Sequence, residues 1–267
     1  MVKADNAGDV PGNLACGRRL PQADLSGGGG GGGPGRRMLV LLACTQQKAE
    51  QPEAPLTWQD FLDPERLRRR TEEMRGHMRR ARDMFTSPLF LGALEAVATL
   101  RQALGQDAVG VLVVSAAYGA IPEDREIAPY DVSFGAVSIE EARWRGEHLG
   151  LPAAVRAASG DYPLVLSLLG KSYRAATDLP GDEPLPGKRI YLTGTSGLHW
   201  LPEGSSQVRL GAAEMEAFGA GPMTVKAKVL QHFATGILRG GAAALDEVFS
   251  HVGAEGFLKV ALAGRDI

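Results

Sequence analysis

The chain has 267 residues, 44% of them hydrophobic and 22% charged, which is enough apolar material for a sizeable core. This composition excludes a mini-protein and a largely disordered chain. The 29 Lys and Arg residues nearly balance the 31 Asp and Glu residues, so any basic surface that attracts nucleic acid has to be local.

The first expected segment is a flexible tail over residues 1–37. It contains seven consecutive glycines, Gly27 to Gly33, and this composition cannot bury enough apolar surface to offset the backbone entropy of folding. We expect the tail to be disordered and the folded domain to cover 38–267. Met38 is either an alternative start or the first residue of a complete domain that carries a tail.

From Met38 onward, short apolar runs alternate with longer helical periods. This pattern predicts an α/β protein with a mainly parallel sheet flanked by helices. The runs at 38–44 and 109–116 are apolar throughout, as in strands that are covered on both faces. The run at 189–194 is a third expected strand, and the run at 163–169 suits either a strand or a helix.

Helical periodicity predicts five helices. Asp63 supplies an N-cap for the first of them and Pro64 takes its first position, while Gly240 and Gly241 end the fourth. The C-terminal part, about 222–267, is expected to be helical. The five predicted helices cover residues 64–84, 88–104, 139–159, 224–238 and 242–252.

The cysteine content and the hydropathy pattern predict the compartment of the protein and its relation to membranes. Only Cys16 and Cys44 are present, which is too few for a disulfide framework and typical of a reducing compartment, so we expect a cytoplasmic protein. No run reaches the roughly 18 apolar residues of a membrane span, and the N-terminus lacks a signal-peptide pattern. No membrane partner is therefore expected.

Polar segments follow three of the predicted strands. In parallel α/β sheets, ligands bind beyond the carboxyl ends of the strands, so these segments are where a site is expected. The three segments are Cys-Thr-Gln-Gln-Lys at 44–48, the long loop from Ser115 to Asp131, and Gly-Thr-Ser-Gly-Leu-His-Trp at 194–200.

Four motifs in chain order resemble a known family: ACTQQK, ARDMFTSPLF, VVSAAYGAIPEDREIAPYD and GTSGLHWL. They are similar to YaaA-like bacterial and phage domains with a Cys-Ser/Thr-x-x-Lys strand end and a Ser-Ala-x-x-Gly…Pro-Tyr-Asp segment. More distantly, they resemble an archaeosine synthase domain related to uracil-DNA glycosylases. The likeness covers about 38–202, with Phe85 in place of a Tyr and Ala120 in place of a Leu. It implies a nucleic-acid or nucleobase partner and protection of DNA under stress.

The loop from Ser115 to Asp131 supplies the candidate catalytic residues. Hydrolysis of an N-glycosidic bond needs a carboxylate that orients water or stabilises positive charge on the sugar, and Asp131 is our candidate. Asp131 could instead cap a turn. Tyr118 could stack on a base, Ser115 ends an apolar strand with a hydroxyl, and Gly119 could let the backbone approach a ligand. The alternative for these three residues is an ordinary turn with a packed aromatic ring, but we favour a function, because Ser115 ends an otherwise apolar strand and Asp131 follows within the same loop.

Further candidates for base or phosphate binding lie in the other two segments. Cys44 is either a nucleophile at a strand end or, more commonly for a free cysteine, a small buried hydrophobe. Next to it, Thr45 and Lys48 could contact a phosphate, although Lys48 could also be solvated. Hydroxyl and backbone donors at Thr195 and Ser196 could hold a base edge, with His199 in a lid.

An arginine-rich run lies at 65–82. It holds eight arginines and three glutamates, and in one helix this surplus of five positive charges could neutralise several phosphates. A solvated face with internal ion pairs is the alternative. We take Arg69, Arg79 and Arg82 as the candidate phosphate ligands.

The functional hypothesis is a DNA-associated protein that acts on a nucleobase or damaged DNA, with glycosylase-like hydrolysis of the N-glycosidic bond. The five histidines are scattered without cysteine partners, and no phosphate-loop or dinucleotide fingerprint is present, so neither a metal nor a cofactor is expected. Two alternatives remain. One is a non-catalytic DNA-binding stress protein of the YaaA type, and the other is an enzyme on free nucleosides.

Overall fold

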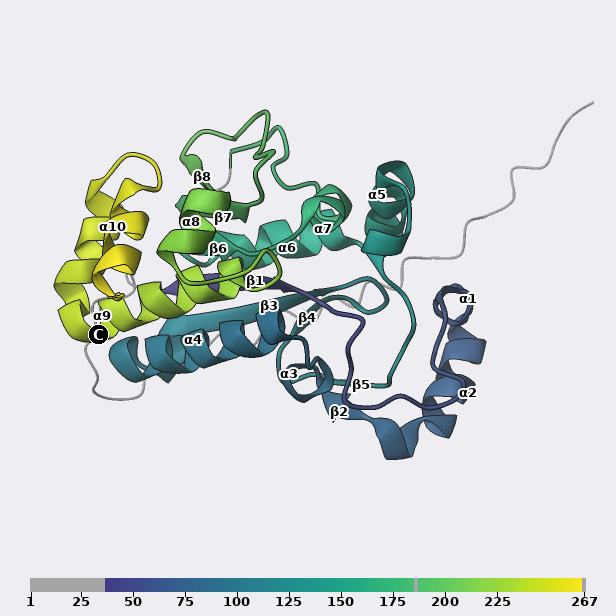
Figure 1. Cartoon of the computed structure of the whole chain (residues 1–267). Coiled ribbons are helices and arrows are strands. Elements are labelled where there is room, and N and C mark those ends of the chain that lie inside the picture. The colour runs from purple at the N-terminus through teal and green to yellow at the C-terminus, as the bar shows by residue number, and fades with distance from the viewer. Residues whose placement is uncertain (1–36, 185–186, 266–267) are drawn as a thin grey trace, which may run out of the picture.

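The computed structural model describes residues 37–184 and 187–265, so the predicted tail at 1–37 lies outside the described residues except for Arg37. A six-stranded sheet in the order β4-β3-β1-β6-β7-β8 forms the centre of the molecule (Figure 1). Its strands are β1 (Met38–Ala43), β3 (Val109–Ser115), β4 (Gly119–Pro122), β6 (Leu164–Ser167), β7 (Lys188–Thr193) and β8 (Ser205–Arg209).

The sheet is mainly parallel, as predicted. β1 pairs in parallel with β3 and with β6, and the parallel pairing continues through β7 to β8, while β4 returns antiparallel along β3. The five residues from Met38 to Leu42 are at most 1% exposed, because helices cover both faces of a central parallel strand. The run at 163–169, which could have been a helix, forms strand β6.

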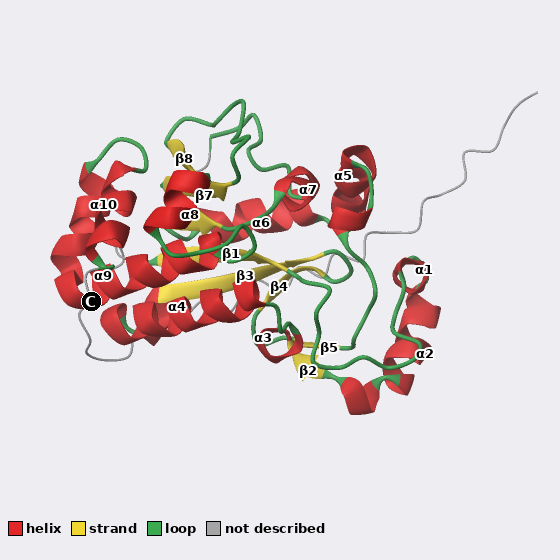
Figure 2. Cartoon of the chain, viewed as in Figure 1, coloured by secondary structure: helices red, strands yellow, loops and turns green. Residues whose placement is uncertain are grey.

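Helices cover the two faces of this sheet (Figure 2). On one face, α4 and α9 pack against each other and against the strands, and on the other lie α6 and α7. The helices are α1 (Trp58–Phe61), α2 (Pro64–Glu73), α3 (Ala81–Met84), α4 (Pro88–Leu104), α5 (Ile139–His148), α6 (Leu151–Gly160), α7 (Lys171–Ala176), α8 (Ala212–Ala217), α9 (Val225–Ser250) and α10 (Glu255–Ala263).

The single helix predicted at 64–84 is wrong. α2 ends at Glu73, a 3-10 turn follows at Arg75–His77, and the chain then extends as β2 (Arg79–Arg80) before α3 begins. β2 pairs with β5 (Glu126–Ile127), which lies in the loop after β4. Tertiary pairing therefore overrides helix propensity here, and the arginines are spread over several elements (Figure 1).

Glycines set two further helix boundaries, one that differs from the prediction and one that agrees with it. The helix expected at 139–159 is two helices, because Gly150 adopts a left-handed conformation with φ of 64° and α6 starts again with Pro152 in its first turn. The predicted break between the helices at 224–238 and 242–252 is confirmed, because Gly241 interrupts α9 with a non-helical conformation at φ of 57°. Glycine accommodates both conformations at little steric cost.

Among the described helices, none is both long enough and apolar enough to cross a membrane. The helical C-terminal part forms as expected, since α9 and α10 pack on each other through the stacked rings of Phe233 and Phe257, whose centroids lie 4.5 Å apart.

Candidate functional site

The carboxyl ends of the parallel strands all lie at one edge of the sheet. Beyond this edge, the loop that follows β1 meets the long segment that follows β3 and includes β4 and β5. A bridge between Leu56 and Tyr130, together with the backbone bond from Asp131 N to Leu56 O of 2.7 Å, holds the two loops together. The residues after β1 and those after β3 are thus brought to a common place by the topology. We call the group formed there by Cys44, Lys48, Ser115, Tyr130 and Tyr173 the strand-end cluster.

Cys44 lies at the bottom of this cluster and is 4% exposed. Its Sγ lies 3.2 Å from the Tyr173 hydroxyl and accepts a bond of 3.4 Å from the Ala116 backbone N–H. Burial raises the pKa of the Tyr173 phenol strongly, and the neighbouring Cys44 raises it further. The thiol is therefore a packed, hydrogen-bonded group between β1, β3 and α7.

Ser115 closes the turn that follows β3. Its Oγ accepts bonds from the backbone N–H of Ala117 at 3.2 Å and of Tyr118 at 3.0 Å, and it pairs with the Tyr130 hydroxyl at 2.8 Å. Gly119 comes next with φ of 74°, and a Cβ there would lie 3.2 Å from the Leu149 carbonyl oxygen. Both residues thus have structural tasks in this turn, in line with the alternative of an ordinary turn rather than with the functional role that we favoured.

Tyr118 lies nearer the surface than Tyr130. Its hydroxyl is 3.1 Å from the backbone N and 3.3 Å from the carbonyl O of Ala128, and burial raises its pKa to about 12. The ring packs edge-on against Phe61 of α1 and against Tyr130, with ring centroids 4.9 Å and 5.5 Å apart. Phe61 therefore covers the aromatic part of the cluster from the outside.

Lys48 supplies the cluster's positive charge and is 7% exposed. Its Nζ donates to the Thr45 carbonyl oxygen at 3.0 Å and lies 4.6 Å from the centre of the Tyr130 ring. Burial lowers the pKa of Lys48, while the nearby Cys44 and Asp131 oppose that shift. The exposed Asp131 thus lies within electrostatic range of a buried amine.

The loop after β7 lies at the same edge of the sheet but apart from this cluster. Thr195, Ser196 and His199 are exposed, and β6 separates β7 from β1. No bond between described residues joins these three to Cys44, Lys48 or Ser115. Thr45 is partly buried and donates from its hydroxyl to the Gln47 carbonyl oxygen.

Most of the arginines between 65 and 82 are in ion pairs. Arg79 pairs with Glu50, and Arg82 with Asp124 at 2.8 Å. Arg69 and Arg80 are exposed and make no ion pair with a described residue. The remaining pairs are Arg66 with Asp60, Arg68 with Glu65, Arg70 with Glu73 and Arg75 with Glu72.

Sequence reasoning missed three residues near this edge. Two of them, Tyr130 and Tyr173, complete the cluster around Cys44. The third is Lys226 on α9, which donates to the carbonyl oxygens of Leu168 and Leu169, directly after β6, at 2.9 and 3.0 Å. Tyr130 stands in the quoted Pro-Tyr-Asp motif, so a signal was present. Tyr173 and Lys226 reach the strand ends only through tertiary packing, for which the sequence carries no local signal.

Lys226 predicts a pH dependence of stability. Burial, aided by Arg174, lowers its pKa to about 7, whereas the unfolded chain retains a lysine pKa near 10.4. Between these values the unfolded state binds more protons, so this residue makes the free energy of unfolding rise with pH. We expect urea titrations at pH 7 and pH 9 to show a smaller rise for Lys226→Met than for the unmodified chain.

The matched control is Lys228→Met, which changes an exposed lysine on the same helix. It should retain the rise of the unmodified chain. An equal rise in Lys226→Met and Lys228→Met would contradict the assignment of this pH dependence to Lys226.

Comparisons of the chain with models of protein families, with curated proteins and with solved structures gave no match.

Proposed function

We propose that this protein is DNA-associated and acts on a nucleobase, as a glycosylase-like hydrolase of the N-glycosidic bond. The observation that carries the proposal is that Asp131 directly follows Tyr130, whose ring centre lies 4.6 Å from Nζ of the buried Lys48, at the carboxyl edge of β1 and β3. A carboxylate next to an amine of lowered pKa is an arrangement suited to acid–base chemistry. The resemblance of the motifs supplies the nucleobase as substrate.

In the proposed reaction, Asp131 orients a water molecule toward the anomeric carbon of the sugar. The new C–O bond forms as the C–N bond to the base breaks, Asp131 accepts the proton of the water, and the base leaves with a proton from solvent or a nearby donor. Lys48 supplies a positive charge within electrostatic range of Asp131. Tyr118 stacks on the base, which requires α1 to move, because Phe61 contacts that ring.

In this proposal, exposed arginines bind the phosphate backbone of the DNA. Arg69 and Arg80, which pair with no described carboxylate, can bind phosphate, and Arg79 and Arg82 could exchange their carboxylate partners for it. Extruding a base from the duplex costs a few kcal/mol, which phosphate contacts and stacking offset. Binding should therefore weaken steeply with salt.

The test is release of a base from duplexes that carry uracil, hypoxanthine or oxidised guanine. We expect Asp131→Asn to lower the rate at least about 100-fold, in the range found for general acid–base groups. The matched control, Asp107→Asn, changes an exposed carboxylate before β3, at the opposite edge of the sheet, and should keep the full rate. Equal rates for the two variants, or no release from any duplex, would refute the hydrolase.

A second candidate function, non-catalytic DNA binding, is favoured by the burial of the cluster. Ser115, Tyr130 and Cys44 are 0%, 2% and 4% exposed, so packed side chains occupy the place where a substrate has to enter. In that case gel shifts at low salt detect duplex binding that Arg69→Ala with Arg80→Ala weakens and Asp131→Asn leaves unchanged. Cleavage of free nucleosides without any DNA affinity would instead favour an enzyme on nucleosides.

A further inference from the structure

Lys226, on the first turn of α9, places its amine in surroundings that are unusual for a lysine. Its Nζ donates to the carbonyl oxygens of Leu168 at 2.9 Å and of Leu169 at 3.0 Å, directly after β6. Both leucines are buried, and Lys226 makes no ion pair with a described carboxylate. A lysine away from water usually has an anionic partner. The surroundings of Lys226 thus lack the anion that would keep its amine protonated.

A second cation lies beside this amine. Arg174 of α7 is 7% exposed, and its Nη1 donates to the same Leu169 carbonyl oxygen at 2.8 Å. The two nitrogen atoms therefore share one acceptor, and like charges this close together repel each other. A guanidinium keeps its proton in proteins, so the lysine is the group that loses one. Burial, together with Arg174, lowers the pKa of Lys226 to about 7.

The hydrogen bonds determine what a neutral Lys226 can do. A neutral amine has two N–H groups and one lone pair, and the carbonyl oxygens of Leu168 and Leu169 can accept both N–H groups. The lone pair then has no partner among the described residues. A desolvated lysine next to another cation is a nucleophile toward carbonyl carbons. Lys226 therefore has the arrangement of a lysine that forms imines.

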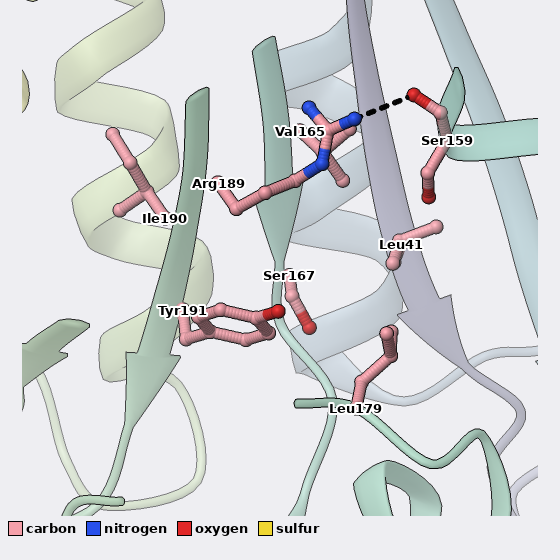
Figure 3. Close-up of a pocket in the computed structure, with 8 residues that line it drawn as sticks. All are labelled: Leu41, Ser159, Val165, Ser167, Leu179, Arg189, Ile190 and Tyr191. Carbon is pink, nitrogen blue, oxygen red and sulfur yellow. Dashed lines mark hydrogen bonds between the residues drawn. The ribbon is translucent and has the colours of Figure 1, made fainter. Parts of the chain in front are cut away.

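The position of the amine and the charge next to it indicate which carbonyl compound it would take. The Lys226 side chain is partly exposed, so a reactant reaches it from the solvent. The nearby cavity between β6 and β7 (Figure 3) has a volume of about 10 Å³ and holds at most one water molecule, so it cannot admit the reactant. Arg174 makes no ion pair with a described carboxylate, and its charge attracts a reactant that carries a negative group. A small carbonyl compound with an adjacent carboxylate meets both conditions.

We propose that Lys226 is a reactive amine that forms an imine with a small 2-oxo carboxylate, of which glyoxylate is the smallest. The nitrogen lone pair attacks the carbonyl carbon, and a C–N bond forms. The carbonyl oxygen leaves as water with the two protons of the neutral amine, so the step needs no oxidant or reductant. Arg174 attracts the carboxylate. The site uses no residue of the strand-end cluster, so this inference is independent of the proposed hydrolase.

Reductive trapping tests the proposal on the unmodified chain. Glyoxylate and cyanoborohydride are added at pH 7, the imine is reduced to a stable secondary amine, and peptide mass spectrometry gives the labelling rate of each lysine. The matched control is Lys228, an exposed lysine on the same helix. At this pH an ordinary lysine is neutral in fewer than about one molecule in a thousand. We therefore expect Lys226 to react at least about tenfold faster than Lys228, and this ratio should fall as the pH is raised.

Two further measurements decide the proposal. Lys226→Met should remove the fast phase of labelling and leave the rate at Lys228 unchanged. If this variant fails to fold, the ratio in the unmodified chain decides alone, because both lysines are measured in one sample. Acetaldehyde, which has no carboxylate, should show a smaller preference for Lys226 than glyoxylate does. An equal preference would overturn the assignment of a carboxylate-bearing reactant, and labelling of Lys226 no faster than of Lys228 would overturn the proposal as a whole.

Discussion

Replacing Gly146 by alanine is expected to lower the free energy of unfolding by about 3 kcal/mol, the upper part of the range for overpacked cores. Gly146 lies on α5 where it crosses α7, and an alanine Cβ there would stand 2.0 Å from the carbonyl oxygen and 2.6 Å from the carbonyl carbon of Ala176. Backbone atoms cannot rotate aside, so the two helices have to separate. Urea denaturation measures the loss.

The same substitution should reach the strand-end cluster. α7 carries Tyr173, whose hydroxyl lies 3.2 Å from Cys44 Sγ, so moving α7 exposes the thiol. We expect Cys44 in Gly146→Ala to react faster with a thiol reagent under native conditions. Gly160→Ala is the control, because a Cβ at this exposed end of α6 has no heavy atom within 4 Å. Equal free energies of unfolding for Gly146→Ala and Gly160→Ala would contradict this prediction, because they would show that α5 and α7 can accommodate the added methyl group without loss of stability.

The sheet could be predicted from the sequence because its signals are local. The uninterrupted apolar run from Met38 indicates a strand covered on both faces, and such strands are characteristic of parallel sheets. The short strand at Ser205–Arg209 was missed, because its alternating polar residues suit an edge strand but also a loop. Its pairing with β7 is decided by tertiary contacts.

The arginine-rich run shows why the elements around the site were harder to predict. Charged residues favour a helix over the whole run, yet Arg79 and Arg80 leave it to pair with Ile127 and Glu126. That choice depends on a strand nearly fifty residues away, for which the run itself carries no signal. The candidate site was predictable at the level of which strand ends meet, since the order of parallel strands brings Cys44 near Ser115, but not at the level of the tyrosines that fill the space between them.

Tyr130 is the residue on which this packing depends, and Tyr130→Ala is expected to lower the free energy of unfolding by about 4 kcal/mol. The ring is 2% exposed and contacts Phe61, Phe85 and Tyr118, with Lys48 Nζ over its face. Truncation leaves a cavity between three elements and removes the surface on which the amine rests. Thermal or urea unfolding measures the effect.

Tyr130→Phe separates packing from chemistry at the same position. It keeps the ring and removes only the hydroxyl, and Ser115 Oγ still accepts bonds from Ala117 N and Tyr118 N, so the cost should be about 1 kcal/mol. If the cluster only supports the fold, the phenylalanine variant keeps its base-release or DNA-binding activity. A loss of base release without a comparable loss of stability would mean that the Tyr130 hydroxyl takes part in the reaction. A loss above 3 kcal/mol in Tyr130→Phe would show that the buried hydrogen bond, rather than the ring, holds the cluster together.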